Sequence, residues 1–435
     1  MRIEPVWAWL TGAETPTQVG VLTRVEETGA GSFLYDASYL KAGGHALDPG
    51  QLRHRDARRP IPIRAADREG IPGIIADAGP DAWGRRVLAQ DLGYEPDALD
   101  ALTHSADDGA GHLTVGDLTV KPAIELLDLV ELADAIERRQ AGIPAKAHRL
   151  VDQVLSPDTA LGGAKPKAST QVAGFPWIAK FTERGDPIHL PFYEAAAMRM
   201  AARIGLNCAE VKVEPLPQGR SALLVKRFDR LPGGTRIPMA SGLTVLGPAA
   251  QGLGPARSYL KLGQALKKWA READSAQVLP ELWDRIVFNG LVGNGDDHPR
   301  NHALLFLDGK WRLSPAFDIV PMYHPRESVA LAMPFLNLTP TRATAAVTAD
   351  NLLRCAPQYG VAMEQARTRL TDMLERIQAE WHDVLTELGA PATVADETKP
   401  VVDWVATVLK QVRAIRDSDL QAPKPGKRRG WAWAP

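Results

Sequence analysis

The chain has 435 residues and a mass of 47.2 kDa, which exceeds one ordinary core and predicts two or three domains. Hydrophobic residues make up 45% and charged residues 24%, and these values exclude a disordered or fibrous class. The formal net charge is −1, so the chain as a whole has no field that attracts nucleic acid or an anionic membrane.

The cysteine content and the N-terminus bear on the compartment. The two cysteines, Cys208 and Cys355, are far apart and have no metal-type spacing around them, which is typical of a reducing compartment. The N-terminal stretch MRIEPVWAWLTGAETPT lacks the apolar segment of a secretory signal, and no apolar run approaches the ~20 residues of a membrane span. We therefore expect a cytoplasmic protein without a membrane partner.

The first part of the chain predicts a small α+β module over residues 1–120. Short alternating runs broken by Gly and Thr are typical of strands, at 6–10, 19–25 and 32–40. Residues 73–93 predict a turn that leads into a helix with Pro80 near its start.

A helix and linker are expected over residues 121–145. Apolar residues recur at helical spacing from Ile124 to Arg139, and the Gly-Ile-Pro sequence at 142–144 ends that helix.

The following region alternates strand and helix and resembles a nucleotide-binding lobe, which we place at residues 146–235. Its helix is expected over 190–205 and ends at Gly205. Strands are expected on both sides of this helix, at 175–182, 210–216 and 221–229.

After a Pro-Gly-Gly turn at 232–234 the chain becomes mainly helical, and we assign residues 236–420 to a helical lobe. Helices are expected at 258–270, 281–292, 350–388 and 401–415. The last residues, 421–435, are basic and Pro-rich and predict a flexible, solvated tail rather than a binding arm.

A polar loop, GNGDDHPRNH at 293–302, follows one of these helices. Two short apolar runs come next, joined by Asp308-Gly309, a strong hairpin signal, and the sequence PAFDIVP follows directly. Because the hairpin folds the chain back on itself, we expect one site to contain Asp296, Asn301 and Asp318.

This set of side chains suits phosphoryl transfer. The reaction needs a carboxylate to orient the attacking hydroxyl and accept its proton, and oxygen ligands for Mg²⁺ on the phosphates. Protein kinases place the Asn five positions after the catalytic Asp, which is the spacing from Asp296 to Asn301.

Two other interpretations of this loop stay open. Asp and Asn often only cap and turn a loop, and the DxxxxN spacing alone is weak. His298 and His302 are four residues apart and could hold zinc on a helix, although Pro299 and the strand-like run after His302 argue against a helix there.

Residues upstream favour the phosphoryl-transfer interpretation. The stretch TALGGAKPKAST at 159–170 is a Gly-rich, Lys-bearing turn, and Gly allows the close backbone approach that phosphates need. Lys180 is the only charge inside an apolar strand, where kinases keep the lysine that contacts the phosphates, and Glu194 on the next helix is placed to pair with it. A chance pair with a snorkelling lysine is the alternative.

Taken in order, these motifs resemble the HipA family of serine/threonine-protein kinase toxins from bacterial type II toxin–antitoxin modules. The resemblance covers nearly the whole chain, through the motifs FLYDASYL, GPDAWGRR, LGGAKPK, WIAKF, VKRFDR, GNGDDHPRN and PAFDIVP. It implies an α+β fold with a bilobal protein-kinase-like core, a small N-terminal module and a mainly helical C-terminal lobe.

The resemblance also implies roles for individual residues. Asp296 becomes the catalytic base, and Asn301 and Asp318 become ligands of Mg²⁺. The nucleotide, ATP, is then bound by a phosphate loop, by the Lys180–Glu194 pair, by an adenine hinge and by residues near the ribose and phosphates. These are Gly162, Gly163, Ala164, Lys165, Pro166 and Lys167 in the loop, Lys226, Arg227 and Phe228 in the hinge, and Asp229 and His298.

Substrate and partners follow from the same resemblance. Family members phosphorylate translation proteins, typically an aminoacyl-tRNA synthetase, and are restrained by a HipB-like helix-turn-helix antitoxin, through which any DNA contact is expected. Several relatives carry an autophosphorylated Ser in the loop, at the place of Ala160 here, so self-modification is absent or moved to Thr159.

Two other function classes remain. A metal-dependent phosphohydrolase could use the same Asp/His/Asn loop, but it would not need Lys180 or the Gly-rich turn. A catalytically decayed module that binds antitoxin and DNA would be expected to have lost a base or metal ligand, and the sequence retains Asp296, Asn301 and Asp318.

Overall fold

The computed structural model of the chain describes residues 1–54, 59–65, 68–121, 128–140, 165–250, 256–270, 275–339 and 341–416. Thr159, residues 162–164 of the predicted phosphate loop and the tail at 421–435 lie outside these ranges.

The N-terminal part is an antiparallel five-stranded sheet with short helices, as the alternating runs predict. The strand order is β4-β3-β2-β1-β5, with bounds β1 (Arg2–Ala8), β2 (Thr17–Arg24), β3 (Gly31–Tyr35), β4 (Ile63–Ala65) and β5 (Leu113–Val115). The helices are α1 (Ala37–Lys41), α2 (Gly73–Ala76), α3 (Ala82–Leu92) and α4 (Ala98–His104). We call residues 1–116 the N-terminal module.

One predicted run in this module is two elements. Strand β3 ends at Tyr35, and the rest of the run forms helix α1. The helix begins there because the Asp36 side chain accepts a hydrogen bond from the Ser38 amide at 2.7 Å and caps it.

A second antiparallel sheet has the order β6-β7-β9-β8, and we call it the cleft sheet. Its strands are β6 (Lys167–Val172), β7 (Phe175–Lys180), β8 (Val211–Pro215) and β9 (Ser221–Lys226), and the helix α7 (Leu190–Arg203) connects β7 to β8. The sequence predicted β7, β8, β9 and α7 within a few residues, but β6 was interpreted as part of the Gly-rich turn.

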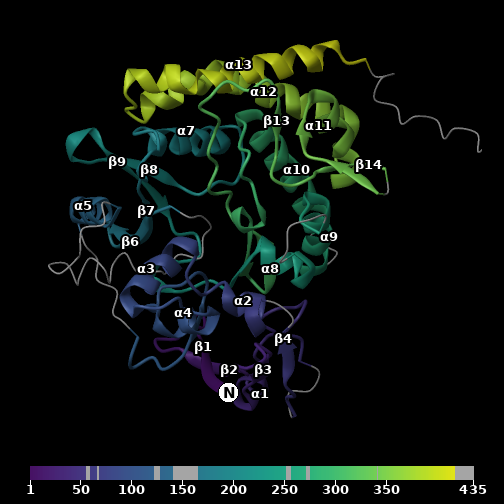
Figure 1. Cartoon of the computed structure of the whole chain (residues 1–435). Coiled ribbons are helices and arrows are strands. Elements are labelled where there is room, and N and C mark those ends of the chain that lie inside the picture. Colours follow the sequence, from purple (N-terminus) through teal and green to yellow (C-terminus); the bar gives the residue numbers. More distant parts are fainter. Residues whose placement is uncertain are drawn as a thin grey trace, which may run out of the picture.

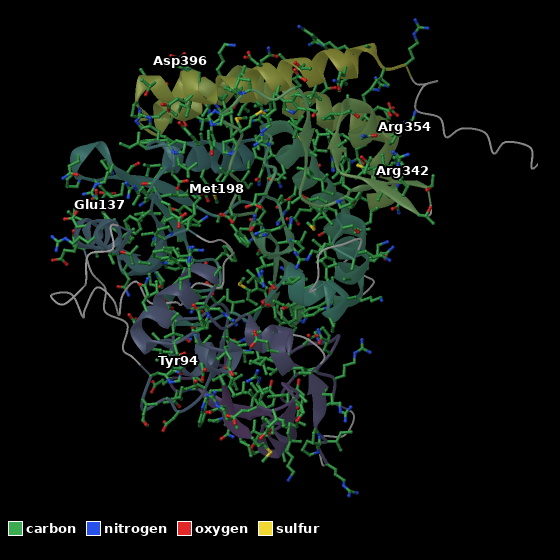
Figure 2. The ribbon with its side chains drawn as sticks, viewed as in Figure 1. Tyr94, Glu137, Met198, Arg342, Arg354 and Asp396 are labelled. Atoms are coloured by element: carbon green, nitrogen blue, oxygen red, sulfur yellow. The ribbon has the colours of Figure 1, made fainter. Side chains whose placement is uncertain are left out.

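Different helices pack on the two faces of the cleft sheet. Trp177 and Ala179 of β7 pack on α5 (Leu129–Gln140), whereas Ile178 belongs to the core shared with α7. Figure 1 shows α5 beside β6 at the margin of the molecule, and Figure 2 shows Glu137 of α5 at the surface and Met198 of α7 within the packed interior. The helix expected in the linker therefore covers the cleft sheet, while the predicted domain boundaries stay predictions.

The helical lobe contains six helices in the part of the chain that the structure describes. They are α8 (Gly242–Leu246), α9 (Tyr259–Ala270), α10 (Ser275–Val292), α11 (Ala349–Cys355), α12 (Met363–Glu387) and α13 (Ala392–Ala414). Helix α10 is central, since its apolar face is fully buried, and α12 and α13 lie side by side at the end of the molecule opposite the N-terminal module (Figure 1). None of the described helices has the length and apolar character to cross a membrane.

Short strands complete this lobe. A three-stranded sheet has the order β10-β11-β12, with β10 (Met239–Ser241), β11 (Ala303–Leu307) and β12 (Lys310–Leu313). Two-stranded ladders join β13 (Val329–Ala330) to β16 (Ala346–Val347) and β14 (Leu336–Thr339) to β15 (Arg342–Thr344).

The predicted hairpin is confirmed and places the polar loop. Strands β11 and β12 are antiparallel, and both turn residues have positive φ, 52° at Asp308 and 74° at Gly309, as a tight hairpin requires. The polar loop precedes β11 and the PAFD sequence follows β12, so the hairpin brings the two together.

Candidate active site

A cleft of about 330 Å³ lies between the cleft sheet and the helical lobe. Residues from both sides line it. From the sheet side come Lys165, Lys167, Lys180 and Glu194, and from the helical side come Asn294, Asp296, Asn301 and Asp318. The structure therefore brings together the predicted base, both predicted metal ligands and three predicted phosphate-binding lysines.

Lys180 joins the two sides of the cleft. It ends strand β7, and its Nζ lies 2.6 Å from Oε1 of Glu194 and 2.5 Å from Oδ1 of Asp318. Burial opposes the charge on this lysine, but the carboxylates of Asp318 and Glu194 outweigh it and raise the pKa of Lys180. The predicted pair with Glu194 is present, and Asp318 is a second partner.

Asp318 has a strained backbone. Its φ is 60°, a left-handed conformation that a non-glycine residue adopts at a cost. Burial opposes ionisation of its carboxyl group, but Lys180, with smaller contributions from Lys167 and His298, holds the pKa of Asp318 below its usual value. The site therefore keeps this carboxylate ionised.

The polar loop presents Asp296 at the mouth of the cleft. Its carbonyl oxygen accepts hydrogen bonds from the His298 amide at 2.7 Å and from Nδ2 of Asn301 at 3.0 Å, which tie the loop together. Partial desolvation and the carboxylates of Asp318 and Asp297 raise the pKa of Asp296, while His298 opposes the shift. A carboxylate with a raised pKa is a stronger proton acceptor.

Asp297 does not line the cleft and instead stabilises the polar loop. Its side chain is buried and accepts hydrogen bonds from the Tyr259 hydroxyl and, at 3.0 Å, from Nδ2 of Asn289. Nε2 of His302 lies 3.1 Å from its Oδ1. Sequence reasoning missed Tyr259 and Asn289, although an Asn inside the apolar run IVFNGLV was a signal of a buried polar contact.

The donor atoms at this end of the cleft fit Mg²⁺. Oδ1 of Asn301 is buried and has no hydrogen-bond partner among the described residues, and the Asp318 carboxylate lines the same cleft. An amide and a carboxylate oxygen are ligands that Mg²⁺ accepts together with water and phosphate.

The zinc interpretation gains no support. His298 and His302 flank a 3₁₀ turn at Pro299–Asn301 rather than lying on one face of an α-helix. Within the described ranges, no group of three or more His, Cys, Asp and Glu side chains could hold a metal ion.

The described end of the predicted phosphate loop enters the cleft. Nζ of Lys165 lies 2.7 Å from the Asp186 carboxylate, and Nζ of Lys167 lies 2.6 Å from Oδ2 of Asp81. Pro166 contributes its carbonyl, which accepts a hydrogen bond from the Phe181 amide at 2.9 Å. The predictions for residues 162–164 and for Thr159 stay predictions.

The predicted hinge side chains do not line the cleft. The Lys226 side chain pairs with Glu210 at 2.8 Å, and the amides of Lys226 and Arg227 donate to carbonyls of the cleft sheet, those of Glu210 and Pro176. The Phe228 ring lies 5.2 Å from that of Phe317.

Asp229, which was expected near the ribose, does not line the cleft. Asp229 is fully buried, and its carboxylate accepts hydrogen bonds from Arg227, from Arg230 and from the Gly111 amide. Burial opposes its charge, but Arg227 and Arg230 hold its pKa well below the usual range. Arg227 also binds the Asp108 carboxylate at 2.7 Å, so this network joins the N-terminal module to the core.

Known family models match most of the chain. The model of the HipA N-terminal domain matches residues 11–116, and that of the HipA-like C-terminal domain matches residues 159–381.

Two curated proteins of Sinorhizobium fredii are similar in sequence. The one named "Putative kinase Y4dM" is 29% identical over 51% of this chain and 56% of its own length. The one named "Putative kinase Y4mE" is 29% identical over 42% of this chain and 44% of its own length. The chain thus spans about half the length of the curated relatives that it matches.

A solved structure confirms the fold. It is a chain of the HipA, HipB and operator DNA complex from the toxin–antitoxin system of Shewanella oneidensis MR-1, with a TM-score of 0.66 and 19% sequence identity. The similarity covers 92% of this chain and 97% of that one, so the predicted α+β fold with an N-terminal module and a bilobal core is correct. On the family models and this fold, the chain belongs to the HipA family.

Proposed function

We propose that the chain is an ATP- and Mg²⁺-dependent serine/threonine protein kinase that acts as a toxin. The observation that carries this proposal is the contact of Lys180 with both Glu194 and Asp318 in a cleft that also contains Asp296 and Asn301. A lysine held by a helix carboxylate, a base and two metal ligands are the parts that phosphoryl transfer from ATP requires.

Different residues of the cleft have different roles in this reaction. Lys180, with Lys165 and Lys167, binds phosphate oxygens, and Asp296 orients the substrate hydroxyl. That hydroxyl oxygen forms a bond to the γ-phosphorus while the bond from the γ-phosphorus to the bridging oxygen of ADP breaks, and Asp296 takes the hydroxyl proton. Asn301 and Asp318 would hold Mg²⁺, which would neutralise negative charge on the phosphates.

The similar proteins support the biological part of the proposal. The Sinorhizobium fredii relatives have names of kinases, and the Shewanella oneidensis structure contains HipB and operator DNA beside HipA. We infer a cytoplasmic kinase that is neutralised by a HipB-like helix-turn-helix antitoxin and reaches DNA only through it. Its substrate is a translation protein, such as an aminoacyl-tRNA synthetase.

Growth and labelling experiments test the toxin role. Wild-type protein expressed without its antitoxin should arrest growth, and Asp296→Ala should not, because arrest depends on phosphoryl transfer. Purified protein with Mg²⁺ and [γ-³²P]ATP should label a translation protein in a lysate on Ser or Thr, and EDTA should abolish the labelling.

The outcomes separate the alternatives. Equal growth arrest by both forms would show that kinase activity is not the toxic agent. Release of inorganic phosphate without labelled protein would indicate a phosphohydrolase instead. Binding of antitoxin with neither reaction would indicate a decayed regulatory module.

A further inference from the structure

One of the cleft lysines forms an ion pair with the N-terminal module. Nζ of Lys167, at the start of β6, lies 2.6 Å from Oδ2 of Asp81, which precedes helix α3. The two side chains are only 3% and 7% exposed, respectively, so water screens this ion pair little. The contact crosses from the N-terminal module to the cleft sheet.

Lys167 lies opposite the central lysine of the site. In the antiparallel pair of β6 and β7, Lys167 is the direct partner of Lys180, so the two side chains lie on the same face of the sheet. Both side chains line the cleft. Like charges directly opposite each other are destabilising, and here each lysine has its own carboxylate partner, Asp81 for Lys167 and Glu194 with Asp318 for Lys180.

Asp81 is itself fixed by the helix that follows it. Its Oδ1 accepts a hydrogen bond from the Gly84 amide at 2.9 Å and caps helix α3, which leaves Oδ2 for the lysine. Helix capping alone would be served equally by a neutral Asn or Ser. The Asp81 carboxylate thus makes two separate contacts, since Oδ1 caps α3 and Oδ2 lies against the Lys167 ammonium.

We propose that Asp81 is a positioning residue that holds the Lys167 ammonium in the cleft for the nucleotide phosphates, so that the N-terminal module completes the nucleotide site. The inference rests on the proposed function, since it assigns a partner to one of the phosphate-binding groups. Asp81 itself does not touch the nucleotide. It acts through Lys167 by fixing the position of a long and otherwise flexible side chain.

The test is the affinity of Asp81→Asn for Mg-ATP and for adenosine, which lacks phosphates. Asn still caps α3 but cannot hold an ammonium by charge. Mg-ATP should bind about tenfold to a hundredfold more weakly, because the Lys167 ammonium loses its buried ion-pair partner, while adenosine binding is unchanged. In a Lys167→Met background the same substitution should cause no further loss, because its effect passes through the lysine.

Controls separate positioning from folding. Asp36→Asn alters another helix-capping carboxylate of the same module, at α1, and should leave Mg-ATP affinity unchanged. Asp81→Ser, which also caps a helix, provides a second neutral variant if Asp81→Asn lowers the melting temperature.

Each other outcome has one meaning. Unchanged or tighter Mg-ATP binding by folded Asp81→Asn would overturn the inference, as would equal losses for Mg-ATP and adenosine. A further loss in the Lys167→Met background would do the same. Wild-type protein that binds no Mg-ATP at all would overturn the proposed function instead.

Discussion

Asp296 and Asp297 are neighbours in the sequence with opposite surroundings. Asp296 lies at the cleft and is exposed, whereas Asp297 is 3% exposed and is held by Tyr259, Asn289 and His302. A buried carboxylate with several donors supports structure, and its removal leaves those donors unpaired. At the scale of single residues, the loop thus separates a chemical role from a structural one.

This separation predicts different effects of two adjacent substitutions. Asp297→Ala should lower the apparent melting temperature by several degrees, because Tyr259 and Asn289 lose their acceptor. Asp296→Ala should leave it nearly unchanged and act only on phosphoryl transfer. Thermal unfolding followed by fluorescence measures both, with the exposed turn residue Asp308→Asn as the control. A larger loss of stability in Asp296→Ala than in Asp297→Ala would refute the assignment.

The sequence predicted the residues that bear the chemistry better than those that support them. Asp296, Asn301 and Asp318 follow from one loop and one hairpin, and Lys180 from a lone charge in an apolar strand. Asp229 lies outside the lining of the cleft, and one of its partners, Gly111, lies 118 residues earlier in the chain. A local sequence does not report that the distant residues Asp108 and Gly111 will bind this cluster of Asp229 and its neighbouring arginines.

The β11–β12 hairpin is the element that assembles the site. It folds the chain so that the polar loop and Asp318 meet, and its turn depends on two left-handed residues, Asp308 and Gly309. A β-branched residue is strained at such a φ, whereas Asn tolerates it.

Substitutions at the two turn residues should therefore differ in the size of their effect on stability. Gly309→Val should destabilise the hairpin by about 1–2 kcal/mol, the cost of a left-handed conformation. It should also slow phosphoryl transfer, because Asp318 depends on the hairpin for its position. Asp308→Asn should be tolerated. Equal melting temperatures and transfer rates for the two variants would count against this role of the turn.

Elements with clear apolar periodicity were predictable, and short polar ones were not. Helix α7 and strand β7 begin within a residue or two of their predicted positions, because apolar burial defines both. Strand β6 was missed because its sequence, KASTQV, is mostly polar. Its extended conformation depends on backbone pairing with β7, which the local sequence does not show.

At the scale of the whole molecule, polar contacts join the N-terminal module to the core. Asp77 accepts hydrogen bonds from the Ser241 amide and hydroxyl, and the network around Asp229 includes Asp108 and Gly111 of the module. His112 lies in the same segment and is 2% exposed. Both of its ring nitrogens lack hydrogen-bond partners among the described residues.

Because of His112, we expect the stability of the folded protein to decrease at acidic pH. Burial, with nearby His45, Arg236 and Arg230, lowers the pKa of His112 to about 3, whereas an unfolded histidine has a pKa of about 6.5. Between these values the unfolded chain binds the extra proton, so stability should fall as the pH drops from about 6.5 toward 3.

The comparison of two variants checks this prediction. His112→Phe keeps a ring without a titrating group, so the loss of melting temperature from pH 7 to pH 5 should be smaller than in the wild type. His104→Phe replaces an exposed histidine of α4 and should keep the acid sensitivity of the wild type. The same acid sensitivity in all three proteins would argue against His112 as the source.

The most direct test of the kinase assignment is the rate of phosphoryl transfer by Asp296→Asn, measured beside its affinity for Mg-ATP. Transfer from [γ-³²P]ATP to protein should fall by ~10² to 10⁴ relative to the wild type, as expected for the loss of a positioned base. Mg-ATP should still bind, because Lys180, Asn301 and Asp318 remain. Transfer by Asp296→Asn at nearly the wild-type rate, or no transfer by the wild type under conditions in which it binds Mg-ATP, would contradict the account.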